Sequence, residues 1–178
     1  SDETLLIGMI ARWHPQKNHS LLIRSLELIL ARGENFKCLL MGEGMQNDTI
    51  ASLINETGLK ELVILRKEHS NVPAVMSALD IHILSSGFGE GFPNVLAEAM
   101  ACEVPCITTD IGDSEIVIGK TGWLVRENSF EEMADKISEA LILWKDKKKW
   151  LKRSKEARER IINNYQISRM VDSYRELY

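Results

Sequence analysis

The sequence predicts a single α/β domain with a Rossmann-like, doubly wound and mostly parallel sheet. Short apolar runs alternate with segments of helical periodicity along almost the whole chain, and this alternation is typical of parallel sheets covered by helices on both faces. The connecting segments are short, and no internal repeat, low-complexity stretch or linker divides the chain. A chain of 178 residues is long enough for one such domain with a sizeable core.

Six apolar runs are the predicted strands, and the first shows the pattern most clearly. It reads Leu-Leu-Ile-Gly-Met-Ile from Leu5 to Ile10, as expected for a strand buried on both faces of a parallel sheet. In chain order the predicted strands lie at residues 4–11, 36–41, 62–65, 81–84, 104–109 and 121–125. Helices are expected at residues 19–31, 47–57, 72–78, 93–102, 130–144, then up to 164, and 168–178.

Composition restricts the class of protein. The chain is 44% hydrophobic and 27% charged, which is ordinary for a soluble globular protein. A net charge of −4 disfavours a nucleic-acid partner, since nucleic-acid-binding domains usually carry a basic excess. No apolar run approaches the roughly 20 residues that a membrane-spanning helix needs, and we find no signal-peptide pattern.

The cysteines predict a reducing environment. Cys38, Cys102 and Cys106 are odd in number and lie in apolar contexts, so we expect buried free thiols, as in a cytoplasmic protein. No Cys/His cluster has the spacing of metal ligands, so we expect no bound metal. The chain enters a strand almost directly after Ser1, and we interpret this abrupt start as a cut from a longer protein.

The most informative stretch runs from residue 85 to residue 101, directly after the apolar strand 81–84. Three glycines loosen the backbone there, and glycine lets main chain approach a ligand closely. Pro93 then stands where a helix is expected to begin, a position that proline favours. Strand, glycine-rich loop and helix N-terminus together predict an anion site, because unpaired N–H groups and the positive end of the helix dipole point the same way.

Two carboxylates flank this turn. Glu90 lies in the loop and Glu98 about one turn into the helix, so loop and helix start are expected to bring them towards one pocket. Carboxylates repel phosphate but accept hydrogen bonds from hydroxyl groups, and phosphate donors beside hydroxyl acceptors suit a sugar nucleotide. From spacing alone, however, Glu98 is equally well a surface helix residue and Glu90 a solvated loop residue.

From Glu90 to Ala101 the chain reads Glu-Gly-Phe-Pro-Asn-Val-Leu-Ala-Glu-Ala-Met-Ala. This run resembles the Glu-x7-Glu signature of retaining, nucleotide-sugar-dependent glycosyltransferases of the GT-B fold, known as family 4 or group 1. The Gly-Phe-Pro-Asn inside it and the Ala-Met-Ala after it make the match specific. The resemblance extends from about Leu5 to Tyr178. It implies that residues 1–178 are one donor-binding domain, the C-terminal half of a GT-B enzyme whose N-terminal acceptor domain is absent from this chain.

Two cations follow the first predicted strand. Arg12 and Lys17 lie at its C-terminal end, the edge where open α/β sheets bind ligands, although on position alone they could be solvated loop charges. The segment is similar to the Gly-Arg-Leu…Lys-Gly element of these transferases, whose Arg and Lys bind the donor diphosphate. Ala11 and Asn18 stand here at positions where that element usually has glycine.

Three further elements complete the resemblance. Gly42-Glu43-Gly44 resembles the family's Gly-x-Gly, which packs close to the donor site, although a plain turn would read the same. Arg66 lies just past the third predicted strand, where family members read the nucleobase with main-chain groups and often have glycine. Residues 110–117 resemble a Gly-Gly…Glu-Ile-Val element, with Asp113 in place of the second glycine.

The resemblance also implies roles for single residues. Arg12 and Lys17 would hold the diphosphate and stabilise the charge on the leaving group. Glu90 would accept from the donor sugar's hydroxyl groups, which we favour over a nucleophilic role, and Glu98 would accept from the ribose. Sugar or phosphate would also be contacted by the main-chain N–H groups of Gly91, Phe92, Asn94 and Val95. Pro93 lies among them but cannot donate.

By the same resemblance, the full-length enzyme would transfer a hexosyl group from a nucleoside diphosphate sugar to a glycan or lipid-linked acceptor, with retention. A UDP-sugar is the favoured co-substrate, and no cofactor is implied. We expect the fragment alone to bind donor weakly and to be inactive without its own N-terminal domain. Two alternatives remain open: a GT-B sugar-nucleotide epimerase, and a non-catalytic nucleotide-binding module.

A lysine-rich run from Lys145 to Lys152 bears on location. A solvated helix face is one interpretation, and a weak peripheral contact with anionic lipid is the other. The expected location is therefore the cytoplasm, with the inner face of the membrane as the place of any such contact.

Overall fold

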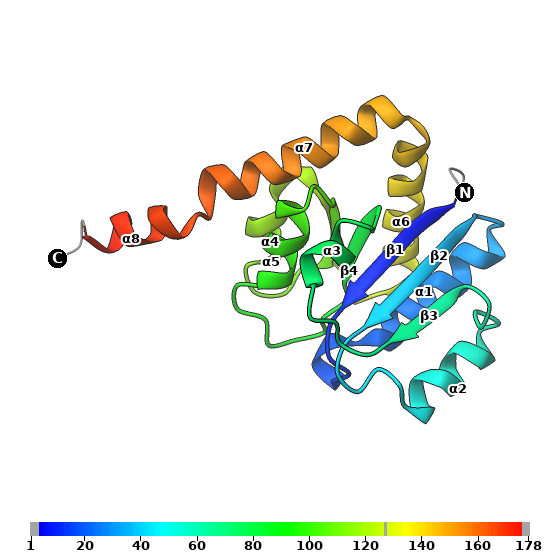
Figure 1. The fold of residues 1–178 in the computed structure, drawn as a ribbon. Coiled ribbons are helices and arrows are strands. Elements are labelled where there is room, and N and C mark those ends of the chain that lie inside the picture. Colours follow the sequence, from blue (N-terminus) through cyan, green and yellow to red (C-terminus); the bar gives the residue numbers. More distant parts are fainter. Residues whose placement is uncertain (1–3, 127, 176–178) are drawn as a thin grey trace.

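The computed structural model describes residues 4–126 and 128–175 and contains one six-stranded sheet (Figure 1). All five strand pairings are parallel, in the order β3-β2-β1-β4-β5-β6. The strands are β1 (Leu5–Ile10), β2 (Phe36–Met41), β3 (Val63–Arg66), β4 (Ile81–Leu84), β5 (Cys106–Thr109) and β6 (Trp123–Val125). The predicted doubly wound α/β fold is thus confirmed, and the sheet is entirely parallel.

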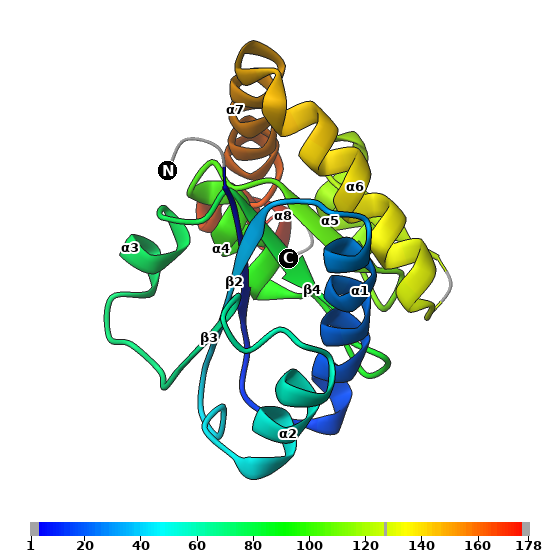
Figure 2. The same cartoon turned by 90° about the vertical axis from the view of Figure 1, so that its right-hand side faces the viewer.

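Helices cover both faces of the sheet (Figure 2). One face carries α1 (His19–Ala31), α2 (Asp48–Glu56) and α6 (Phe130–Lys145). The other carries α3 (Val72–Met76), α4 (Asn94–Ala101), α5 (Ser114–Ile118) and most of α7 (Lys147–Asn164). Short 3-10 helices lie at Pro15–Lys17 and Gly119–Thr121. The last helix, α8 (Ile167–Arg175), projects away from the sheet (Figure 1).

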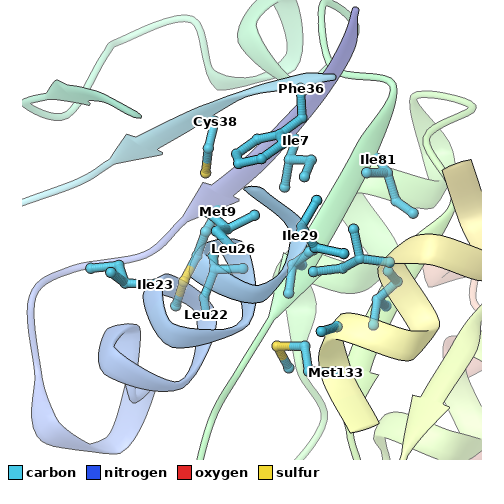
Figure 3. Close-up of a cluster of buried hydrophobic side chains, with 14 of the residues drawn as sticks. Ile7, Met9, Leu22, Ile23, Leu26, Ile29, Phe36, Cys38, Ile81 and Met133 are labelled. Carbon is cyan, nitrogen blue, oxygen red and sulfur yellow. The ribbon is translucent and has the colours of Figure 1, made fainter. Parts of the chain in front are cut away.

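The larger core lies between the sheet and α1. Figure 3 shows four α1 side chains packed against strand side chains and Met133 of α6. All of these side chains are fully or almost fully buried: Leu22, Ile23, Leu26, Ile29, Ile7, Met9, Phe36, Cys38, Ile81 and Met133. Burying one large aliphatic side chain contributes roughly 1.5–3 kcal/mol, so this layer fixes α1, and with it the loop that precedes α1, against the sheet.

The chain reverses its winding direction between β1 and β4. From β1 it proceeds outwards through β2 and β3, then returns to place β4 on the other side of β1, with Gly8 paired to His82. The loops that follow β1 and β4 therefore leave the same edge of the sheet next to each other. This is the topological switch point at which open α/β sheets bind their ligands.

Some details differ from the sequence-based expectations. Pro93 is the residue before α4 and not its first helical residue. The apolar periodicity of residues 130–144 predicts a buried Phe130, but this first residue of α6 is 39% exposed. Cys38 and Cys106 are buried free thiols as predicted, whereas Cys102 is only partly buried. The last three residues of the predicted C-terminal helix lie outside the described part of the chain.

The end of α4 stores backbone strain. Val104 N–H donates to Ala99 O and Glu103 N–H to Met100 O, both at 3.0 Å, which is the Schellman pattern that closes helices. The pattern needs a left-handed residue, and Glu103 supplies it with a φ of 62°. A side chain with Cβ is costly there, and the ion pair of Glu103 with Arg158 is long, at 4.0 Å.

We predict that Glu103→Gly raises the free energy of unfolding by about 0.5–1 kcal/mol, because glycine adopts the left-handed conformation without a Cβ clash. Urea unfolding measures the change. Glu103→Ala is the matched control, since it removes the same carboxylate and keeps the Cβ atom. An equal gain in the alanine variant would contradict a backbone origin.

Candidate functional site

The loop after β1 carries the first two candidate residues. Arg12 is exposed and forms no ion pair with any described residue. Lys17 ends the 3-10 helix, and Asn18 follows in the left-handed conformation with a φ of 47°. Asparagine tolerates that conformation better than most residues, and the Asn18 side chain also accepts from Leu21 N–H to cap α1. Asn18 thus adopts a left-handed conformation that glycine, the usual residue of the resembling element, would adopt without strain.

The loop after β4 is fastened to the β1 loop at several points. Ser85 Oγ donates to the carbonyl oxygens of Lys17 and Asn18, at 2.9 and 3.1 Å. Gly87 N–H donates to Gln16 O at 2.8 Å, and Gln16 Nε2 returns a bond to Gly89 O at 2.7 Å. The two loops therefore hold one geometry relative to each other.

A short ion pair joins these loops. Lys17 Nζ lies 2.5 Å from Glu90 Oε1, and the two side chains are only 17% and 9% exposed. Ser86 Oγ donates to the same oxygen at 2.5 Å. Thr109 Oγ1, at the end of β5, donates to the Ser86 carbonyl at 2.6 Å. Charge-assisted bonds of this kind are stronger than neutral ones, so the Glu90 carboxylate is held firmly.

Gly112 presses on the Glu90 loop from the other side. Its φ is +61°, and a Cβ atom there would lie 2.2 Å from Glu90 O and 2.6 Å from Gly91 O. The neighbouring Asp113 N–H donates to Gly91 O at 3.1 Å. No larger residue fits this contact without moving the loop.

The start of α4 presents unused hydrogen-bond donors. In the described part of the chain, no acceptor faces the main-chain N–H groups of Gly91, Phe92, Asn94 and Val95. Pro93 has no N–H and is buried. These donors and the positive end of the α4 dipole lie at the turn where the sequence predicts an anion site, and such a turn can bind an anion.

Glu98 and Glu90 have different surroundings. It is exposed on α4 and forms no hydrogen bond or ion pair with a described residue. Its side chain lines a groove of about 400 Å³ between α3 and α4, with Val72, Pro73, Met76, Ala101 and Cys102. Glu98 thus lines the α3–α4 groove, whereas Glu90 contacts Lys17 and Ser86; that both carboxylates reach one bound ligand stays a prediction.

The remaining candidates border the same edge of the sheet. Gly42 packs directly on the β1 loop, since a Cβ atom there would lie 2.1 Å from Ala11 O. Its N–H donates to Arg66 O at 3.2 Å. The Arg66 side chain is exposed and donates to its neighbour Leu65 O at 3.0 Å. The contact with Ala11 thus leaves no room for a larger residue than Gly42, and Arg66 ends the edge strand β3.

Two buried histidines lie beneath Lys17. Burial, and then the Lys17 charge, lowers the pKa of His82 to about 3 and that of His19 to about 4. Ile10 N–H donates to His82 Nε2 at 3.3 Å. Among the described residues, no partner faces His82 Nδ1 or either ring nitrogen of His19. Both rings are therefore neutral supports of the β1–β4 junction.

A second hollow adjoins the α4 N-terminus. It measures about 410 Å³ and lies between Phe92, Asn94 and the α7–α8 junction. The rings of Phe92 and Tyr165 lie 5.3 Å apart across one side. Within residues 4–126 and 128–175, no group of three or more His, Cys, Asp or Glu side chains could hold a metal ion, and no described helix is long and apolar enough to cross a membrane.

The family described as "Glycosyl transferases group 1" matches residues 1–160. The chain belongs to this family. The matched region includes the whole sheet and every candidate residue from Arg12 to Glu98. The α/β fold is that of the C-terminal domains of GT-B glycosyltransferases.

Two curated relatives and one solved structure are similar in sequence to this chain. It is 33% identical over 144 residues to N-acetyl-alpha-D-glucosaminyl L-malate synthase of Bacillus anthracis, covering 80% of this chain and 37% of the relative. It is 26% identical over 180 residues to UDP-Gal:alpha-D-GlcNAc-diphosphoundecaprenol alpha-1,3-galactosyltransferase of Escherichia coli, covering 98% of this chain and 45% of the relative. The chain thus spans less than half the length of either relative.

The solved structure is the C-terminal domain of a glycosyl transferase group 1 family protein, LpcC, from Francisella tularensis. It is 25% identical, with a TM-score of 0.77, and the match covers 92% of this chain and 87% of that one. A domain of this size and fold has therefore been crystallised without the rest of its protein.

The structure brings together most of the residues that the sequence singled out. Arg12, Lys17 and Glu90 lie on the two loops at the switch point, and residues 91–95 lie directly beside them. Three supporting residues were missed: Ser86, Thr109 and Gly112. Ser86 could have been identified as a polar residue close after a buried strand. Gly112 could have been identified as the retained glycine of the resembling element. No sequence pattern indicated a supporting role for Thr109.

We predict that stability falls as the pH drops from about 6.5 towards about 4, in part through His82. Unfolded His82 binds a proton in this range, whereas folded His82, with a pKa lowered to about 3, does not, so the unfolded state gains protons and is favoured. His82→Gln should therefore give a shallower fall, by up to about 1.4 kcal/mol per pH unit.

Urea unfolding of wild type and variant at several pH values measures this slope. His69→Gln is the control, because it makes the same substitution at an exposed histidine. Parallel slopes for wild type and His82→Gln would show that His82 does not remain neutral in the fold.

Proposed function

We propose that this chain is the C-terminal, donor-binding domain of a retaining family 4 glycosyltransferase. The observation that carries the proposal is one cluster at the switch point: free N–H groups at the α4 N-terminus beside Arg12 and the Lys17–Glu90 pair. Phosphate suits the N–H groups and cations, and sugar hydroxyl groups suit the carboxylates. A nucleoside diphosphate sugar carries both kinds of group.

Arg12 and Lys17 bind the diphosphate and stabilise its charge as the bond to the sugar breaks. Arg12 is exposed and free to turn towards the ligand, and Lys17 sits at the centre of the two loops. Fixed positive charge aimed at a departing diphosphate lowers the barrier to transfer. Because these two side chains supply that charge, the reaction needs no bound metal and no cofactor.

The other groups orient the donor along the edge of the sheet. Glu90 accepts from the hydroxyl groups of the donor sugar, and this positioning role is favoured over a nucleophilic one. Glu98 accepts from the ribose, and the α3–α4 groove beside it gives the nucleoside an apolar wall. Main-chain groups near Arg66 and Gly42 border the nucleobase.

The donor is a UDP-hexose, and the hexosyl group passes to a glycan or lipid-linked acceptor with retention of configuration. The Escherichia coli relative supports this choice, because its name gives UDP-Gal as donor and a diphosphoundecaprenol-linked sugar as acceptor. Both relatives are named for transfer or synthesis, which favours a transferase over an epimerase or a non-catalytic nucleotide-binding module.

The acceptor site belongs to an N-terminal domain that completes the cleft. The chain spans less than half of its relatives, which leaves length for such a domain. The exposed Ile167 of α8, at 77% exposure, offers an apolar contact for it. We therefore expect the fragment alone to bind donor weakly and to transfer little or no sugar.

The protein works in the cytoplasm, with weak contact to the inner face of the membrane. Residues 145–155 hold seven of the 22 lysine and arginine residues and one of the 26 acidic residues, so this segment carries +6 and the rest of the chain −10. Leu151 is 53% exposed in the middle of it. Figure 1 shows this α6–α7 corner beside the start of β1, at the opposite edge of the sheet from the substrate loops.

We predict that calorimetric titration with UDP, GDP and ADP detects binding of one nucleotide, UDP first, and that Arg12→Ala weakens it at least about tenfold through loss of a charge-assisted bond to phosphate. Arg24→Ala is the control, since Arg24 lies on the outer side of α1 and pairs with Glu27. Equal binding by wild type and Arg12→Ala would remove the diphosphate role from Arg12.

We also predict that the chain sediments with vesicles of phosphatidylcholine and phosphatidylglycerol, and not with phosphatidylcholine alone. Each lysine near an anionic surface contributes about 1 kcal/mol. The double variant Lys148→Glu/Lys155→Glu should thus lower the partition coefficient between vesicle and solution at least about tenfold. The same charge change at two exposed lysines outside this corner, Lys60→Glu/Lys67→Glu, should lower it much less. Equal losses would point to net charge and not to this corner.

A further inference from the structure

The lysine proposed for the diphosphate already has a partner. Lys17 Nζ lies 2.5 Å from Glu90 Oε1, and the Glu90 side chain is only 9% exposed. The two charges therefore neutralise each other in the ligand-free site. Any phosphate that binds Lys17 must draw the ammonium group away from Glu90 or share it.

Glu90 itself has little freedom to move away. Ser86 Oγ holds its Oε1 at 2.5 Å, and Thr109 Oγ1 holds Ser86 in turn through its carbonyl at 2.6 Å. Gly112 packs against the Glu90 carbonyl, at a distance that leaves no room for a Cβ atom. When phosphate takes Lys17, the carboxylate thus stays in place and loses its counter-ion.

We propose that Glu90 competes with the diphosphate for Lys17, and that this competition makes the site prefer the nucleoside diphosphate sugar over the nucleoside diphosphate left after transfer. Glu90 is then the residue that sets the selectivity between substrate and spent nucleotide. The inference rests on the proposed function, since it takes the diphosphate site as given.

Binding of the free nucleoside diphosphate carries the full free-energy cost of separating Lys17 from Glu90. A nucleoside diphosphate takes Lys17 and leaves a largely buried carboxylate beside a phosphate group with nothing to donate to it. A buried charge that loses its partner is strongly unfavourable, and two anions at close range repel each other. The spent nucleotide is therefore held less tightly than its contacts with Arg12 and the N–H groups alone would allow.

The sugar-bearing nucleotide avoids most of that cost. Its terminal phosphate is esterified and carries one negative charge fewer than the terminal phosphate of the free nucleotide. The attached sugar also brings hydroxyl groups that donate to Glu90, and hydrogen bonds to an ionised carboxylate are among the strong ones. Lys17 and Ser86 both donate to Oε1 of Glu90, and no described residue donates to Oε2, so that oxygen is open to the sugar hydroxyl groups. Loss of the sugar on transfer thus weakens the hold on the nucleotide and favours its release.

The test compares the dissociation constants of UDP and of UDP-sugars for wild type and Glu90→Gln. UDP-glucose, UDP-galactose and UDP-N-acetylglucosamine serve as sugar-bearing probes, and calorimetry on the 178-residue chain measures binding. In Glu90→Gln, UDP should bind at least about tenfold more tightly, while the best-binding UDP-sugar should gain less or lose affinity. The ratio of the two constants should fall towards one.

Glu98→Gln is the matched control, because it removes an equal charge from a residue that does not contact Lys17. It should weaken UDP and UDP-sugar alike and leave their ratio unchanged. In a Lys17→Met background, Glu90→Gln should tighten UDP by a much smaller factor than in wild type, because only the repulsion between Glu90 and phosphate is then relieved and no ion pair is broken. Glu90→Asp, which keeps the charge and withdraws it by one methylene, should tighten UDP by a smaller factor and provides a second variant if Glu90→Gln folds poorly.

The outcomes separate the inference from the proposed function. If wild type binds UDP in an Arg12-dependent way and neither Glu90 variant binds UDP more tightly, the donor site stands and the competition is wrong. An equal gain in the Lys17→Met background would also overturn it, because simple charge removal would then explain the whole gain. If wild type and variants bind none of UDP, GDP, ADP and the UDP-sugars, the proposed function fails and the inference fails with it.

Discussion

The pairing of β1 with β4 in the middle of the sheet is the constraint on which the site depends. It places the loop that carries Lys17 beside the loop that carries Glu90, although the two residues lie 73 positions apart. His82 supports the junction from within, since its neutral ring accepts from Ile10 N–H where the strand ladder has ended. A slip of this register would separate the ion pair and both loops at once.

The site combines a rigid frame with unused bonding groups. Ser86, Thr109 and Gly112 fix the Glu90 loop, while the N–H groups from Gly91 to Val95 point at no described acceptor. Ordered but unsatisfied donors at an exposed helix start remain hydrated until a ligand replaces the water. A ligand that brings oxygen acceptors therefore finds the donors already aligned and loses little conformational entropy in arranging them.

Most of the fold could be predicted from the sequence, because apolar runs and helical periodicity indicate which residues are buried. The bounds of α1, β2 and β4 agree with the expected ones, and Arg12, Lys17 and Glu90 meet because each follows a strand that ends at the same edge.

What could not be predicted depends on tertiary contacts that local sequence does not encode. The groove between α3 and α4 that Glu98 lines could not be predicted, because it depends on how these two helices pack. Gly112 matters only because the Glu90 loop packs on it. His82 lies within an apolar run, so the sequence did not indicate that its ring accepts a hydrogen bond from Ile10 N–H of β1.

The most direct test of the donor site is the amide NMR spectrum of the isotope-labelled chain during titration with UDP and a UDP-sugar. The account predicts that the largest shift changes fall on the amides of Gly91, Phe92, Asn94 and Val95, together with the Arg12–Lys17 loop. Changes confined to the opposite edge of the sheet, around the α6–α7 corner, would contradict it.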